Sequence, residues 1–135
     1  MTPPSIQHGS LTADQVTLVL RDLPVDLSFA DEDDVLVYWS GETYDSCDPK
    51  WIGRDVRDCH PAGSLDCLEE ILRAFKAGER DLAEGWGQDG ERFKHTRYFA
   101  VRDEAGAYKG ILEVNQDVTA IRALSGHQAL PGWGE

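Results

Sequence analysis

The stretch FKHTRYFAVRDEAGAYKGILEVNQDV, residues 93–118, decides the fold class of this chain. Side chains in residues 93–102 alternate between two faces, which is typical of a β-strand, and the same period of two returns in residues 108–118. Glu104-Ala105-Gly106, between these segments, is typical of a turn. The stretch therefore predicts two long antiparallel strands joined by a short connection.

The residues before this pair predict a third strand. Residues 82–88 lead into Asp89-Gly90, a dipeptide typical of a short hairpin turn. The C-terminal half is therefore expected to form a three-stranded antiparallel meander.

A helix is predicted upstream of the meander, over residues 65–77. Ser64 is its expected N-cap and Gly78 its expected left-handed C-cap. Residues 41–63, before the helix, are expected to form loops with one or two short helical turns. Apolar side chains recur at helical spacing in the helix and form one stripe, made of Leu65, Leu68, Ile71, Leu72 and Phe75.

The N-terminal half predicts a helix followed by a hairpin. Thr12 and Gln15 have the spacing of a capping box, which marks the start of a helix. Residues 25–29 and 35–40 have the pattern of two strands. The acidic run Asp31-Glu32-Asp33-Asp34 between them is expected to be a solvated turn.

This order of elements predicts an α+β domain with a five-stranded antiparallel sheet and helices packed on one face. The long connector lets the second half pair beside the first strand, so the expected strand order is 2-1-5-4-3. We expect residues 1–10 to be a flexible leader, residues 11–126 a single domain, and residues 127–135 a tail.

The charge balance excludes two classes of partner. The 135 residues carry 13 Lys and Arg against 25 Asp and Glu, a formal net charge of −12. Nucleic acids and anionic membranes attract clustered cations, so neither is an expected partner. The three cysteines form no CxxC pair, which favours reduced thiols and a cytoplasmic location.

Several blocks of the sequence resemble the PAS family, and most closely the PAS-type module often found C-terminal to hemerythrin-like domains. The resemblance covers about residues 12–126 and implies a PAS fold. It implies a sensory or ligand-binding module that commonly dimerises, has no catalytic residues to carry over, and here is expected to be freestanding. The blocks are Leu23-Pro24-Val25-Asp26-Leu27, Gly53 with Asp58-Cys59-His60-Pro61, Phe75-Lys76-Ala77-Gly78, Arg97-Tyr98-Phe99-Ala100-Val101-Arg102-Asp103 and Leu112-Glu113-Val114-Asn115-Gln116-Asp117-Val118-Thr119.

The chain departs from the family at two places that bear on a binding site. Gly85-Trp86-Gly87 stands where bulky apolar residues usually flank the tryptophan of the third strand. Thr96 stands where the family usually has isoleucine. The two glycines either open a cavity or let another backbone approach closely.

Five residues are predicted to contact a small molecule between the sheet and the helix over residues 65–77. Either His60 or His95 could serve as an axial haem ligand, although a hydrogen-bonded core histidine is the more common role. Arg97 could anchor a carboxylate, or form a salt bridge with Glu84 or Glu113. The aromatic candidates could equally belong to the core or to an interface. The five candidates are His60, Trp86, His95, Arg97 and Tyr98.

Cys59-His60 suggests two further kinds of chemistry, neither of which is expected. A metal site would recruit Cys67 and Cys47, but no standard zinc spacing occurs. A thiolate nucleophile would need the two side chains to face each other, and sequence neighbours rarely do. We therefore assign no catalytic residue and no metal site.

The sequence leaves three functions open. The first is a PAS-type sensory module that binds a small molecule and signals through dimer or partner contacts, without enzymatic activity. The second is a ligand-free homodimerisation module, which uses the exposed sheet face and the helix over residues 12–22. The third is a thiol- or metal-dependent enzyme at Cys59-His60.

Overall fold

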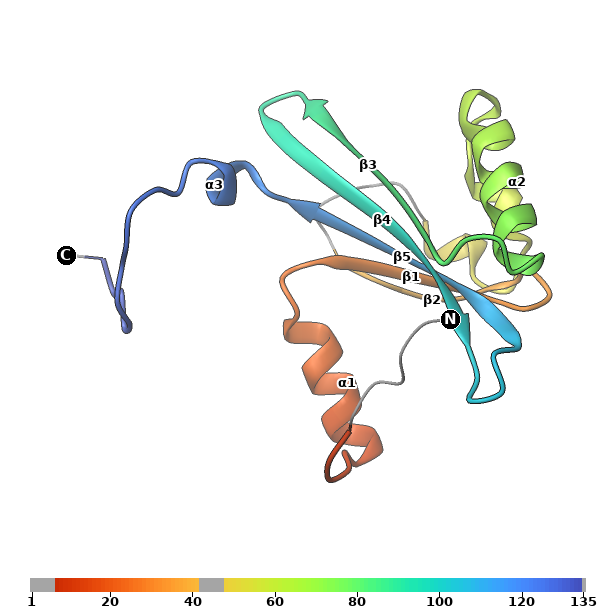
Figure 1. Cartoon of the computed structure of the whole chain (residues 1–135), viewed down its shortest axis with the longest axis horizontal. Coiled ribbons are helices and arrows are strands. Elements are labelled where there is room, and N and C mark those ends of the chain that lie inside the picture. Colours follow the sequence, from red (N-terminus) through yellow and green to blue (C-terminus); the bar gives the residue numbers. More distant parts are fainter. Residues whose placement is uncertain (1–6, 42–47, 135) are drawn as a thin grey trace.

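The computed structural model describes residues 7–41 and 48–134, and its core is one antiparallel sheet. The strand order is β2-β1-β5-β4-β3, so the predicted topology and the α+β class are confirmed (Figure 1). The strands are β1 (Asp26–Asp31), β2 (Leu36–Ser40), β3 (Leu82–Asp89), β4 (Arg92–Arg102) and β5 (Tyr108–Asp117).

Strand β5 lies at the centre of the sheet and pairs with both β1 and β4. Gly110 in β5 lies opposite Asp31 in β1 and Val101 in β4. Its φ is 155°, and a Cβ atom there would lie 2.4 Å from the Ala30 carbonyl oxygen. Only glycine lets the two backbones approach this closely, so Gly110 helps to set the register of β5 against β1.

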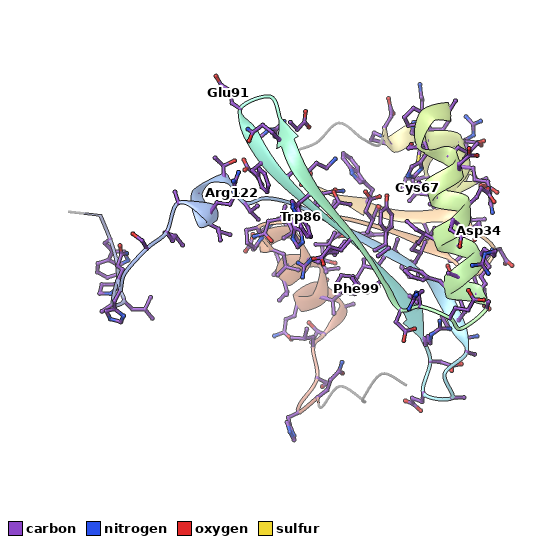
Figure 2. The ribbon with its side chains drawn as sticks, turned by 45° about the horizontal axis from the view of Figure 1, so that its top comes forward. Asp34, Cys67, Trp86, Glu91, Phe99 and Arg122 are labelled. Carbon is purple, nitrogen blue, oxygen red and sulfur yellow. The ribbon has the colours of Figure 1, made fainter. Side chains whose placement is uncertain are left out.

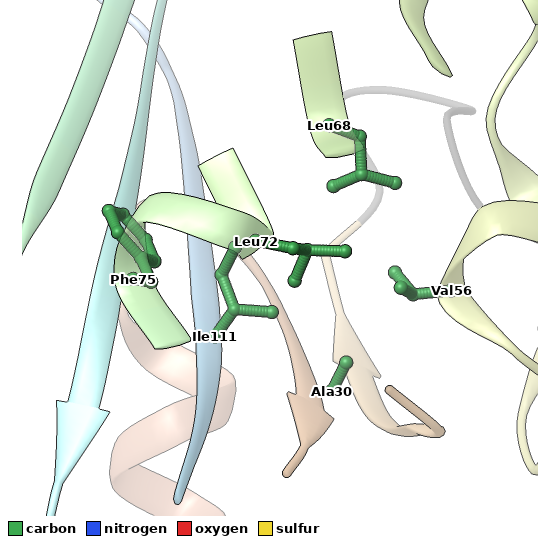
Figure 3. Close-up of a cluster of buried hydrophobic side chains, with 6 residues drawn as sticks. All are labelled: Ala30, Val56, Leu68, Leu72, Phe75 and Ile111. Atoms are coloured by element: carbon green, nitrogen blue, oxygen red, sulfur yellow. The ribbon is translucent and has the colours of Figure 1, made fainter. Parts of the chain in front are cut away.

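Helix α2 (Ala62–Lys76) covers one face of the sheet, called here the inner face. It begins three residues earlier than predicted, and Pro61 takes the N-cap position. Ser64 lies inside the helix, where its hydroxyl donates to the Pro61 carbonyl at 3.1 Å. The predicted C-terminal glycine is confirmed, because Gly78 has a φ of 76°. The buried cluster between helix and sheet consists of Ala30, Val56, Leu68, Leu72, Phe75 and Ile111 (Figure 3).

In the described part of the connection between β2 and α2 lie two short 3₁₀ helices, in agreement with the one or two short helical turns predicted for residues 41–63. They are η1 (Pro49–Trp51) and η2 (Val56–Cys59). The Val56 amide donates to the Asp34 carbonyl at 2.8 Å, which ties η2 to the turn between β1 and β2. The segment therefore packs on the domain, next to α2.

Helix α1 (Ala13–Asp22) has the predicted capping box but does not share the buried core. Gln15 and Thr12 exchange hydrogen bonds of 2.9 and 3.1 Å. No residue of α1 is buried, and Figure 1 shows the helix standing apart from α2. The expected packing of helices on one face is thus made by α2 and the 3₁₀ turns, while α1 leaves Val16, Leu18 and Val19 exposed.

The C-terminal residues extend away from the sheet. A short helix, α3 (Thr119–Arg122), follows β5, and the remaining described chain runs outward (Figure 1). Its large side chains Leu124, Leu130 and Trp133 are exposed. Within the described residues, none of the helices has the length and apolar character needed to cross a bilayer.

The prediction that Asp31-Glu32-Asp33-Asp34 is merely a solvated turn is wrong for its last residue. Asp34 is 6% exposed and has a positive φ of 65°. One carboxylate oxygen accepts hydrogen bonds from Arg57 Nη1 at 3.0 Å and from Lys76 Nζ at 2.7 Å. Asp34 therefore joins the β1–β2 turn to η2 and to the last turn of α2, on the α2 side of the molecule (Figure 2).

Candidate functional site

A cavity of about 510 Å³ lies between the inner face of the sheet and the segment that runs from η2 into α2. Cavities that bind small molecules have volumes of roughly 300–1,000 Å³, so this one is large enough for an organic ligand. Four strands and the η2–α2 segment contribute its walls. The lining residues are Ser28, Leu36, Val56, Cys59, His60, Pro61, Ser64, Lys94, Thr96, Tyr98 and Glu113.

The floor of the cavity is a chain of hydrogen bonds that crosses three strands. Glu113 accepts from Ser28 Oγ at 3.3 Å and from Asn115 Nδ2 at 2.9 Å. Thr96 Oγ1 donates to Asn115 Oδ1 at 2.6 Å. Both ends of the buried Asn115 amide are therefore occupied, which fixes its orientation and holds the Glu113 carboxylate in place.

Tyr98 stands beside Glu113 on the wall formed by β4 and β5. Burial raises the pKa of Tyr98 well above its ordinary range, and the neighbouring Glu113 carboxylate raises it further. The phenol consequently stays protonated at neutral pH. It offers a hydroxyl group that can donate a hydrogen bond.

The side chains of Cys59 and His60 converge at the end of η2. The Val56 carbonyl lies 3.2 Å from Cys59 Sγ and 2.9 Å from His60 Nδ1, and Sγ lies 3.6 Å from Nδ1. The expectation that these neighbours point apart is wrong. Both side chains instead fold back onto the carbonyl of Val56, the first residue of the 3₁₀ turn that ends at Cys59.

The charge state of His60 reflects these contacts. The hydrogen bond with Cys59 raises the pKa of His60 above its ordinary value, and the bond to the Val56 carbonyl adds to this effect. Burial acts in the opposite direction. The two hydrogen bonds therefore stabilise the protonated imidazole relative to that of a free histidine side chain.

The sheet separates the five predicted ligand contacts into two groups. His60 and Tyr98 line the cavity. Trp86, His95 and Arg97 lie on the opposite face, called here the outer face, because side chains alternate along β3 and β4. The predicted grouping of Trp86, His95 and Tyr98 around one cavity is therefore not observed.

The outer-face residues contact one another and not the cavity. Trp86 is 67% exposed, its ring centroid lies 6.3 Å from that of His95, and Figure 2 shows it apart from α2. His95 Nε2 lies 2.7 Å from Glu84 Oε2. Arg97 stacks over the Phe99 ring at 5.6 Å and forms no ion pair among the described residues, so the expected salt bridge with Glu84 or Glu113 is not observed.

Among the described residues, few side chains are placed to bind a metal ion or a haem. In the part of the chain that the structure describes, no three His, Cys, Asp or Glu residues are grouped so as to hold a metal ion. Cys47, a member of the metal set considered above, lies outside the described residues. Of the two histidines considered for haem, His60 lines the cavity and His95 does not.

The glycines beside Trp86 leave open space next to the cavity. Gly85 and Gly87 pair with Thr96 and Lys94, both of which line the cavity. A Cβ atom at either glycine would meet no atom within 4 Å. Of the two alternatives left by the sequence, open space is therefore the one observed within this chain.

Most of the cavity floor lies outside the five predicted ligand contacts. Ser28 and Asn115 are not among the predicted site residues, Thr96 is predicted only as a departure from the family that bears on a binding site, and Glu113 only as a partner for Arg97. A usable signal existed, because Thr96 and Tyr98 share one face of β4 while Glu113 and Asn115 share one face of β5. Polar residues at alternate positions on a face expected to be covered by a helix indicate a polar cavity.

Comparison with known proteins places these features in context. A family model described as a PAS domain matches residues 16–119. The C-terminal domain of a Streptococcus mutans protein superposes with a TM-score of 0.82 at 30% identity, covering 92% of this chain and 98% of that one. No curated protein matches the chain.

More distant solved structures share the fold. The PAS domain of a Colwellia psychrerythraea protein has a TM-score of 0.58 at 18% identity and covers 79% of this chain and 97% of its own. A sensory box sensor histidine kinase from Vibrio cholerae has a TM-score of 0.56 at 17% identity, with coverages of 77% and 89%.

Proposed function

This chain belongs to the PAS domain family, and on that premise we propose that it is a sensory module that binds a small molecule and carries out no turnover. The observation that carries the proposal is the cavity, which has an organic ligand's volume and polar side chains converging from several elements. The signalling role is supported by the fold shared with a protein described as a sensory box sensor histidine kinase. A partner protein and a cytoplasmic location belong to the same proposal.

The chemistry of the lining favours a ligand with both apolar surface and hydrogen-bond donors. Leu36, Val56 and Pro61 supply apolar contacts. The Glu113 carboxylate has about four lone-pair sites, so it can accept a further hydrogen bond besides those from Ser28, Asn115 and the neighbouring Tyr98 hydroxyl. We infer that a donor group of the ligand, such as an amine or amide N–H, pairs with Glu113.

The test is native mass spectrometry of the purified protein together with its ultraviolet–visible spectrum. A bound mass that denaturation releases, or the thermal stabilisation of the protein by a metabolite library member, is the expected result. Glu113→Gln should weaken that binding, while Glu104→Gln, in an exposed turn, should not. The proposal fails if no bound mass and no stabilising compound is found for the folded wild type.

A second function, homodimerisation, is favoured by the apolar surface outside the core. Leu82 and Trp86 are exposed on the edge strand β3, and α1 exposes Val16, Leu18 and Val19. Exposed apolar patches of this kind mark protein contacts, and a second copy of the chain is the partner that we propose. Sedimentation equilibrium tests this, with Trp86→Ser expected to shift a dimer toward monomer. A wild-type monomer at high micromolar concentration would rule out the dimer.

A further inference from the structure

Two oppositely charged side chains line the cavity from separate positions along the sheet. Glu113 on β5 is directly opposite Tyr98 on β4 and forms part of the hydrogen-bonded floor. Lys94 lies four residues before Tyr98 on β4 and also lines the cavity. At about 3.3 Å per residue along a strand, the Cα atoms of Lys94 and Tyr98 are about 13 Å apart. The carboxylate and the ammonium therefore enter the cavity from different ends.

The space beside Lys94 is open on the side of β3. Gly87 is directly opposite Lys94, and Gly85 is directly opposite Thr96. A Cβ atom at either glycine would meet no atom within 4 Å. Figure 1 shows the hairpin end of β3 and β4 away from α2. A ligand that contacts Glu113 can therefore extend toward Lys94 without displacing a side chain at either glycine position.

Lys94 can bind an anionic group in this space. It is half-buried in the cavity wall and takes part in a further interaction within the protein. An ammonium group has three N–H donors, so it can also donate to an oxygen of a ligand. Asp117, directly opposite on β5, is exposed and accepts a hydrogen bond from the Thr119 hydroxyl at 2.6 Å.

The charges of the lining differ from those of the chain as a whole. The chain carries 13 Lys and Arg against 25 Asp and Glu. The described lining of the cavity instead includes one lysine, one histidine and one acidic residue, namely Lys94, His60 and Glu113. The cavity walls thus carry no excess of negative charge, and a carboxylate can enter beside Lys94 without meeting a cluster of acidic residues.

We propose that the ligand is an elongated aminocarboxylate, whose amine donates to Glu113 and whose carboxylate binds Lys94. The proposal rests on the proposed function, because it gives the chemical class of the ligand for the same cavity. It adds an anionic group to the donor group already inferred. Methylene groups between the two ends suit a cavity that also has apolar walls.

The test titrates the isotope-labelled whole chain with ε-aminocaproate at neutral pH and follows the backbone amide chemical shifts. Caproate and hexylamine, which each keep one of the two charged ends, are titrated separately. Loss of a hydrogen bond between charged groups costs roughly 1.5–3 kcal/mol, so ε-aminocaproate should bind at least about tenfold more tightly than either. Glycine carries its amine and carboxylate on the same carbon, cannot reach both side chains, and should bind no more tightly than the single-ended compounds.

A matched pair of lysine variants tests the position of the carboxylate. Lys94→Met removes the ammonium and keeps an unbranched apolar side chain, so the affinity for ε-aminocaproate should fall about tenfold, to that of hexylamine. Lys109→Met changes an exposed lysine of β5 that does not line the cavity, and this variant should bind ε-aminocaproate as the wild type does.

Two outcomes would overturn the proposal. One is that the wild type does not bind ε-aminocaproate, or binds it no more tightly than caproate or hexylamine, a result that depends on no variant. The other is an unchanged affinity for ε-aminocaproate in folded Lys94→Met. If native mass spectrometry shows a bound mass while either outcome occurs, the ligand class alone is wrong. If no bound mass and no stabilising compound is found either, the proposed function fails as well.

Discussion

Replacement of Asp34 by alanine should destabilise the domain more than any other change to the acidic turn. The substitution removes the acceptor of two charged hydrogen bonds, from Arg57 and Lys76, at a position that is 6% exposed. It also places an alanine at a φ of 65°, a conformation that aspartate adopts more readily than alanine.

The expected magnitude follows from these contacts. A hydrogen bond to a charged group contributes about 1.5–3 kcal/mol, so two give about 3–6 kcal/mol as an upper bound. Arg57 keeps its contacts with Asp55 and Glu69, and both cations are partly exposed and regain water, so we expect about 2 kcal/mol from the lost acceptor. The left-handed backbone adds about 1 kcal/mol for alanine, which brings the total to about 3 kcal/mol.

The assay is urea unfolding followed by circular dichroism, with the m-value compared between variants. At an m-value of about 2 kcal/mol/M, a loss of 3 kcal/mol lowers the midpoint by about 1.5 M urea. Asp34→Gly removes the carboxylate without the backbone penalty and should lose about 2 kcal/mol. Asp33→Ala, in the same turn but exposed, is the matched control and should stay within about 0.5 kcal/mol of wild type.

Two results would refute this reasoning. If Asp34→Ala unfolds at the same urea concentration as Asp33→Ala, the buried carboxylate does not stabilise the turn, η2 and α2 together. If Asp34→Gly is as unstable as Asp34→Ala, the positive φ contributes nothing and the whole effect belongs to the lost hydrogen bonds.

Three further predictions concern a close backbone contact and two titrating groups. Gly110→Ala should lower the free energy of unfolding in urea by about 3 kcal/mol or more, because its Cβ would lie 2.4 Å from the Ala30 carbonyl oxygen. Gly85→Ala is the control and should stay near wild type, because a Cβ there meets open space. Equal losses in the two variants would contradict the argument. His60 has a raised pKa in the folded state, so its stabilising contribution is present below about pH 6.5 and is lost as the pH rises through the folded pKa. The stability difference between wild type and His60→Gln should therefore shrink from pH 5.5 to pH 8.5, and a difference that grows over that range would contradict it. Burial raises the pKa of Tyr108 to about 12. The difference in phenolate absorbance between wild type and Tyr108→Phe should therefore appear with a midpoint near pH 12 in folded protein. A midpoint near pH 10 would instead show an ordinary phenol.

The sequence was sufficient for the sheet because strand alternation and turn residues are local signals. Asp89-Gly90 and the alternation in β4 and β5 predicted the meander that is observed. Alternation also separates His95 from Tyr98, since they are three positions apart on one strand. The sequence does not indicate which face of the sheet α2 covers. For that reason, candidates from both faces were predicted to line one cavity.

The features that the sequence did not predict depend on contacts between distant segments. Asp34 is buried because Arg57 and Lys76, far along the chain, both reach its carboxylate. Cys59 and His60 meet because η2 ends at that point and directs the Val56 carbonyl toward both side chains. Neither contact has a signature within a short window of sequence.

The cavity floor shows how such a site depends on strand register. Ser28 and Glu113 are directly paired across β1 and β5, as are Thr96 and Asn115 across β4 and β5, and the floor's hydrogen bonds follow these pairs. A slip of one residue in β5 would turn Glu113 and Asn115 to the outer face and remove the polar floor altogether. The close approach of Gly110 to β1 opposes such a slip, because the residues on either side of it carry side chains that the narrow gap excludes. The glycine that permits the backbone contact therefore also keeps the Glu113 carboxylate in the cavity.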